Sequence, residues 1–203
     1  MFAYCGNNPI SRIDSTGTSF QTTFYPTCID PGDGKRNDYV IYYYHPESSQ
    51  NLDYPVTRNH VPAEAVYCSV RSFDELVDAI NSTPAYTSDI FIYLHGDENN
   101  LSFYWDLNYN ANHIQSLIND VDISGNIYLF SCKGGRGDLA STMAKATNCN
   151  VIACRYKVSF GSGYARYGYI DFWKYSSAWD EYAWYSFSPD GTMLPYSQYK
   201  ILT

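Results

Sequence analysis

A histidine and a cysteine each follow directly on an apolar stretch of this chain. His95 comes after the run IFIYL and precedes Gly96, whereas Cys132 comes after the run IYLFS and precedes the glycine pair at 134 and 135. A thiol becomes an effective nucleophile when a base takes its proton, and histidine is the side chain best suited to do so near neutral pH. These two residues therefore predict a cysteine nucleophile with a histidine acid/base.

Small residues surround the cysteine. Ser131 precedes it, and Gly134 and Gly135 follow, so we expect these three residues to line a cleft in which a substrate backbone can come close. His95 and Cys132 are 37 positions apart, which is the length of one crossover between neighbouring parallel strands. Ligands of open α/β sheets bind beyond the carboxyl ends of the strands. We therefore expect both side chains to face one cleft at that edge.

Each residue also has a simpler explanation. A cysteine at a strand end is commonly a buried small apolar residue, and a histidine there commonly makes loop hydrogen bonds. The tripeptide at 136–138, Arg-Gly-Asp, matches an adhesion motif, but Asp138 is better explained as the start of a helix. His45, His60 and His113 have no second ligand at metal-binding spacing, so neither a metal nor a cofactor is predicted.

The elements that position the two residues alternate along the chain. Runs rich in β-branched and aromatic residues predict strands, and apolar residues at helical spacing predict helices between them. A strand-helix alternation predicts parallel pairing with right-handed crossovers. The expected strands cover residues 38–44, 65–70, 89–94, 126–130 and 151–154, and the expected helices cover 72–81, 111–121 and 138–147.

The two ends of the chain differ from this central pattern. Residues 1–37 are rich in Gly, Pro and Asn without a sustained period, which predicts a linker or extended arm rather than core elements. Residues 164–174 and 181–187 are aromatic and predict added antiparallel strands or loops. We therefore expect an arm at 1–37 and one α/β domain at 38–203, with a mostly parallel sheet and flanking helices.

Composition excludes several classes of function. The 203 residues include 13 Lys and Arg against 21 Asp and Glu, for a net charge of −8, which disfavours a binder of nucleic-acid phosphates. There is no apolar window of about 18 residues for a membrane span, and the N-terminus lacks the layout of a signal peptide. Six cysteines are too few for a disulfide-built fold of this length, so we expect most of them to be buried thiols.

The His-Gly pair after one strand and the Ser-Cys-x-Gly-Gly run after the next resemble the caspase-like cysteine peptidases. The resemblance covers residues 38–156 and implies a three-layer α/β sandwich. It also implies an endopeptidase in which Cys132 attacks the scissile carbonyl and His95 protonates the leaving amine. The backbone N–H groups of Gly96 and Cys132 would hold the oxyanion. Catalytically silent relatives share these motifs, so a protein- or glycan-binding module is the alternative.

A second resemblance lies at the N-terminus. Residues 2–17, FAYCGNNPISRIDSTG, are similar to the signature that closes the core of RHS-repeat proteins, with departures at Phe2 and Ser15. In that family the signature marks the border between a shell and a variable C-terminal effector. It implies an effector or processing domain of a bacterial RHS-type polymorphic toxin, secreted or on the cell surface as part of a larger protein. The implied partners are a peptide or protein substrate and the parent RHS shell.

Overall fold

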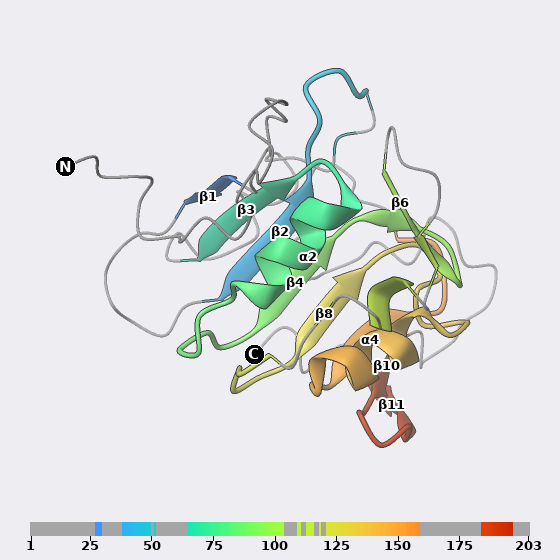
Figure 1. The fold of residues 1–203 in the computed structure, drawn as a ribbon. Helices are drawn as coiled ribbons and strands as arrows, with labels where there is room; N and C mark the ends of the chain where they lie inside the picture. Colours follow the sequence, from blue (N-terminus) through green and yellow to red (C-terminus); the bar gives the residue numbers. More distant parts are fainter. Residues whose placement is uncertain are drawn as a thin grey trace, which may run out of the picture.

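The computed structural model describes residues 27–29, 38–49, 51, 65–103, 109–110, 113–115, 118, 121–158 and 184–196. Their largest element is an eight-stranded mixed sheet in the order β1-β3-β2-β4-β8-β9-β10-β11. The strands are β1 (Thr27–Ile29), β2 (Tyr39–Tyr43), β3 (Val66–Val70), β4 (Ile90–Tyr93), β8 (Ile127–Phe130), β9 (Val151–Cys154), β10 (Trp184–Phe187) and β11 (Met193–Tyr196) (Figure 1).

The five central strands are parallel, as the alternation of strands and helices predicts. β2 pairs in parallel with β3 and β4, β4 with β8, and β8 with β9. The outer strands are antiparallel: β1 pairs with β3, and β10 with β9 and β11. The expectation of an α/β fold with a mostly parallel sheet and aromatic-rich antiparallel additions is confirmed for the described residues. The expected element at 164–174 lies outside them.

Two helices cover one face of the sheet. α2 (Phe73–Asn81) and α4 (Leu139–Thr147) both lie in front of the strands in Figure 1, and their apolar residues share one core cluster with the strand residues Ile41, Ile92 and Leu129. Of the expected helix at 111–121, residues 113–115 are described and helical, and Ile114 and Ile118 join the same cluster. All described helices therefore pack on this face.

Aromatic side chains form the core of the opposite face. The Phe91 ring stacks on Tyr128 with centroids 4.9 Å apart, and Tyr93 stacks on Phe130 at 4.5 Å. The Phe130 ring meets Trp184 edge-on at 5.5 Å. Because alternate residues of β4 and β8 are buried on opposite faces, these strands read as continuously apolar runs. The stacked pairs also hold β4 and β8 in register up to their carboxyl ends.

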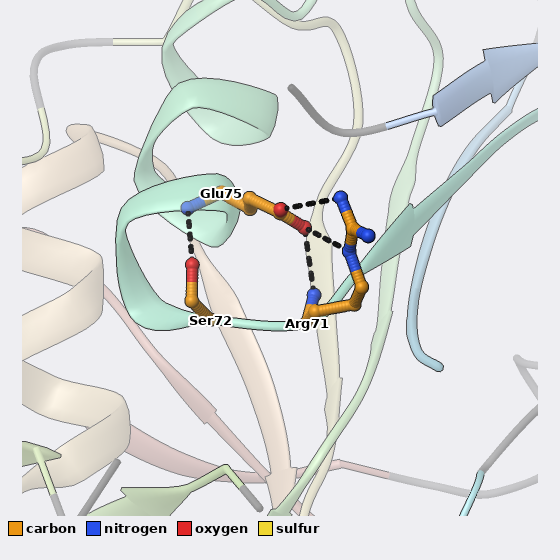
Figure 2. Close-up of polar contacts among 3 residues, drawn as sticks. All are labelled: Arg71, Ser72 and Glu75. Carbon is orange, nitrogen blue, oxygen red and sulfur yellow. Dashed lines mark hydrogen bonds and ion pairs between the residues drawn. The ribbon is translucent and has the colours of Figure 1, made fainter. Parts of the chain in front are cut away.

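Helix α2 begins with a side-chain cap at the end of β3 (Figure 2). The Ser72 hydroxyl accepts the Glu75 backbone N–H at 3.2 Å, which is the cap typical of a serine followed three residues later by a glutamate. The buried Glu75 carboxylate, however, accepts the backbone N–H of Arg71 at 2.8 Å and pairs with the Arg71 guanidinium at 3.0 Å. In the turn from β3 into α2, the charges of Arg71 and Glu75 therefore neutralise each other.

One expectation about the N-terminal part needs correction. β1 lies within residues 1–37, so residues 27–29 form an edge strand of the sheet where an arm without core elements is expected. Cys68 is disulfide-bonded, whereas Cys132, Cys149 and Cys154 are thiols. β1 pairs with β3, a segment distant in sequence, so the local pattern at 27–29 does not reveal this strand. The RHS-like residues 2–17 lie outside the described residues.

At the amino end of the sheet, Asp89 joins the starts of β4 and β8. Its carboxylate accepts the Asn126 backbone N–H at 2.6 Å, and Gly125 N–H donates to the Ser88 carbonyl at 2.8 Å. Burial raises the pKa of Asp89, with a smaller contribution from the nearby Asp38 charge. The ionised form therefore destabilises the folded state relative to the unfolded chain.

We predict that Asp89→Asn becomes more stable relative to the wild type as pH rises. Asp89 binds its proton more tightly in the folded state than in the unfolded chain. As pH rises from the unfolded pKa of 3.8 to above the higher folded pKa, ionisation of Asp89 therefore lowers the stability of the wild type. The asparagine keeps an oxygen for Asn126 N–H and has no charge. Thermal unfolding from pH 3 to pH 7 checks this: a Tm difference that is constant, or that favours the wild type increasingly toward pH 7, contradicts it.

Candidate active site

His95 and Cys132 leave neighbouring strands at matching positions. Tyr93 of β4 lies opposite Phe130 of β8, and the Leu94 N–H continues the pairing with a hydrogen bond to the Phe130 carbonyl at 3.3 Å. His95 is two residues beyond Tyr93, and Cys132 is two residues beyond Phe130. The two residues therefore emerge at the carboxyl edge from adjacent strands, whose backbones are about 5 Å apart while they remain paired.

The glycine of one motif packs directly on the serine of the other. A Cβ atom placed on Gly96 would overlap the Ser131 Oγ and the Asn100 carbonyl oxygen. Ser131 is buried, and its hydroxyl has no hydrogen-bond partner in the described structure. Packing therefore requires glycine at position 96, since a larger residue would push the His95 strand away from the Cys132 strand.

Cys132 opens a tight turn that is fastened to the end of β9. Its thiol is free, half-buried, and donates to the Val158 carbonyl oxygen at 3.6 Å. The next residue, Lys133, has a φ of 57° in the left-handed region, and its N–H donates to the Tyr156 carbonyl at 2.8 Å. These contacts orient the turn so that its first residue faces the segment that follows β9.

The two glycines after Cys132 are buried inside this turn rather than open to a cleft. Gly135 N–H donates to the Cys154 carbonyl at 2.9 Å, and a Cβ atom there would lie 2.7 Å from the Ala153 carbonyl oxygen. Gly134 is buried against the side chain of Leu129. The close approach to the β9 backbone explains Gly135 and the contact with Leu129 explains Gly134, whereas the role of both in lining a cleft stays a prediction.

His95 begins a small antiparallel sheet where a loop is expected. β5 (His95–Gly96) pairs with β6 (Asn100–Ser102), and β6 pairs with β7 (Tyr109–Asn110). The turn between β5 and β6 is held by the Asp97 carboxylate, which accepts the backbone N–H groups of Asn99 and Asn100 at 2.8 and 2.9 Å. The sequence does not reveal this hairpin, because its turn segment is polar and rich in Asn. The turn is closed by hydrogen bonds to the side chain of a single aspartate, Asp97.

Aromatic residues support the histidine. Its half-buried imidazole lies edge-on to the Tyr43 ring at 5.9 Å, and Tyr43 in turn meets Phe103 at 6.0 Å. Tyr43 is buried at the end of β2, the strand on the far side of β4 from β8. Sequence reasoning missed Tyr43 as a supporting residue, because only the order of strands in the sheet brings it beside His95.

An ion pair links the loop that follows His95 to the loop that follows Cys132. The Arg136 guanidinium is 3.7 Å from the Glu98 carboxylate, and a Cβ atom on Gly137 would overlap the Glu98 carbonyl and the Asn99 side chain. Asp138 precedes α4, but its side chain makes no capping hydrogen bond. The Arg-Gly-Asp run therefore packs against the β5–β6 turn, which explains its glycine without an adhesive role.

Within the described ranges, no group of three His, Cys, Asp or Glu side chains is arranged to hold a metal ion. His45 uses its Nδ1 to accept the Glu47 backbone N–H at 3.2 Å, and His60 lies outside those ranges. In the same part of the chain, no helix combines the length and the apolar character that crossing a membrane requires.

At one edge of the sheet, the described structure thus places the Cys132 thiol against the Val158 carbonyl, the His95 imidazole against Tyr43, and Gly96 against Ser131. The catalytic roles expected of His95 and Cys132, and of the Gly96 and Cys132 N–H groups as oxyanion donors, stay predictions. Comparison of the chain with known protein families and with curated proteins finds no family and no relative that matches it.

Proposed function

We propose that this chain is a cysteine endopeptidase with Cys132 as nucleophile and His95 as acid/base. The observation that carries the proposal is the register of β4 and β8, which delivers both residues two positions beyond the same cross-strand pair. The contact of Gly96 with Ser131 supports it, because it joins the two motifs directly. A nucleophile and its base are recognised by such mutual placement on rigid elements.

The chemistry follows from these two groups. His95 takes the thiol proton as the Cys132 sulfur forms a bond to the carbonyl carbon of the substrate, and the N–H groups of Gly96 and Cys132 stabilise the oxyanion. The C–N bond breaks when the protonated His95 gives its proton to the leaving amine. Water then attacks the thioester with His95 as base, which releases the new carboxylate and restores the thiol.

We further propose that the fold is the caspase-like three-layer sandwich and that the chain is an effector or processing domain of a bacterial RHS-type polymorphic toxin. The signature-like residues 2–17 and the pair of strand-end motifs support this assignment. The disulfide at Cys68 supports an oxidising compartment, as expected for a secreted or cell-surface protein. The proposed partners are a peptide or protein substrate and the parent RHS shell.

Selective alkylation of the whole chain, followed by a peptide-library digest, tests the proposal. We predict that iodoacetamide modifies Cys132 at least about 10-fold faster than the buried thiols of Cys149 and Cys154, because a half-buried thiol beside a base reacts most readily. Loss of cleavage, read by mass spectrometry, should follow modification of Cys132. His95→Gln should slow alkylation of Cys132 without changing the other two.

Two outcomes would argue against a peptidase. If cleavage persists after Cys132 is fully alkylated, another group performs the reaction. If no peptide is cleaved under reducing conditions and Cys132, Cys149 and Cys154 react equally slowly, the silent binding module is the better assignment, and a protein or glycan array would identify its ligand.

A further inference from the structure

The disulfide at Cys68 lies inside the sheet, next to its edge strand. Cys68 is the middle residue of β3 and is fully buried in the core cluster that also contains the apolar residues of α2. Its sulfur lies 2.9 Å from the Tyr39 hydroxyl of β2. β3 pairs with β2 on one side and with β1 on the other. A reductant therefore reaches the Cys68 sulfur only when an element packed around it moves.

The register of β1 and β3 points to the partner of Cys68. Three of the other five cysteines are described as thiols outside any disulfide, which leaves Cys5 and Cys28 as partners within the chain. Cys28 is directly opposite Cys68 in the antiparallel pair of β1 and β3. The Cβ atoms at such opposite positions are about 4.5–5.5 Å apart on the same face of a sheet, and a disulfide joins Cβ atoms about 3.5–4.5 Å apart. A bond between Cys28 and Cys68 therefore needs little movement of either strand.

β1 is the strand that such a bond would hold in place. It is the terminal strand in the order of the described sheet, and it pairs with β3 through three residues. Short segments at the edge of a sheet open at a low cost in free energy. A disulfide between Cys28 and Cys68 closes a loop across 40 positions of the chain, so it strongly restricts the freedom that β1 gains when it leaves the sheet. The same opening of β1 uncovers the outer edge of β3, which gives a reductant access to the bond.

We propose that Cys28 is the partner of Cys68 and that their disulfide is a redox-sensitive clamp, which holds β1 on the sheet under oxidising conditions and releases it under reducing ones. In the releasing step, two thiols of a reductant exchange with the disulfide. The reductant is oxidised to a disulfide, and its two thiol hydrogens end on the sulfurs of Cys28 and Cys68. β1 follows the RHS-like residues 2–17 in the chain, so reduction detaches the strand that joins this signature to the sheet.

Peptide mapping tests the pairing without any use of peptidase activity. The unreduced chain is unfolded in the presence of iodoacetamide and digested with trypsin, which cleaves after Lys and Arg. Cys5, Cys28 and Cys68 then fall in three different peptides, residues 1–12, 13–35 and 59–71. We expect mass spectrometry to find peptides 13–35 and 59–71 joined, and to find them separate after reduction. A link from 59–71 to 1–12, a link between two copies of 59–71, or an alkylated 59–71 overturns the assignment.

Hydrogen exchange tests the clamp. The folded chain is treated with dithiothreitol, and amide exchange is compared between the oxidised and the reduced forms. We expect exchange in residues 27–29 and 66–70 to become at least about 10-fold faster on reduction, because β1 then opens freely, whereas exchange in β4 and β8 should stay unchanged. Tm should fall by about 5–15 °C, because the bond no longer restricts the unfolded chain.

Two cysteine variants complete the test of the clamp. Cys28→Ser should show the faster exchange in β1 and β3 with or without dithiothreitol, and the matched control Cys5→Ser should respond to dithiothreitol as the wild type does. If Cys28→Ser does not fold, the reduced wild type and reduced Cys5→Ser supply the same comparison. A disulfide that stays intact in the folded chain under excess dithiothreitol overturns its redox sensitivity. Reduction that leaves exchange in β1 unchanged overturns its role as a clamp.

Discussion

Cys132→Ala is expected to lower kcat/KM for peptide hydrolysis by at least about 1,000-fold, because the sulfur that forms the covalent intermediate is absent. The variant should fold normally, since the Cys132 side chain is half-buried and its single hydrogen bond to Val158 is long. Progress curves with a peptide taken from the library digest, together with thermal unfolding of both proteins, measure the two quantities.

Cys149→Ala is the matched control for this loss. Cys149 is also a thiol outside any disulfide, but it is buried beyond the carboxyl end of α4, where it donates to the Val121 and Thr147 carbonyls at 3.3 Å. The substitution should reduce Tm without reducing kcat/KM of the folded protein by more than about 3-fold. An equal loss of activity in both variants would mean that stability, rather than a nucleophile, accounts for the effect of Cys132→Ala.

Gly96→Ala is expected to lower kcat/KM by about 100-fold or more and to cost about 1–3 kcal/mol of stability. The added methyl group would overlap the Asn100 carbonyl and the Ser131 hydroxyl, so the His95 strand has to move away from the Cys132 strand. A displacement of about 1 Å between reacting groups is enough for a loss of this size. Steady-state kinetics and urea unfolding measure the two effects.

A glycine at the opposite edge of the sheet provides the control. A methyl group on Gly125 would overlap the Asp89 carboxylate and crowd the Ser88 carbonyl, so Gly125→Ala should destabilise the fold through the same kind of clash. Because Gly125 lies at the amino end of β8, kcat/KM of the folded molecules should stay near the wild-type value. If Gly96→Ala retains activity, or if both variants lose activity equally, the spacing of the two motifs does not limit the reaction.

Local patterns in the chain were sufficient to predict the central elements. Residues 90–93 and 127–130 are continuously apolar because their side chains are buried on both faces of the sheet, and such runs indicate strands covered on both sides. Ser72 and the apolar residues after it likewise marked the start of α2. The positions of His95 and Cys132 directly after two such strands could therefore be predicted from the adjacent residues. The parallel pairing could be predicted as well, from the alternation of strands and helices.

Long-range pairing decided the rest, because side-chain alternation reports which face a residue occupies and not which strand lies beside it. The placement of Tyr43 beside His95 depends on β2 being the neighbour of β4, and the surroundings of the Cys132 thiol depend on the packing of the turn after β8 against the end of β9. The β5–β6 hairpin, the edge strand β1 and the disulfide at Cys68 also require partners that no local pattern names. Composition and spacing thus identify the candidate groups, whereas contacts between distant segments determine which side chains surround each of them.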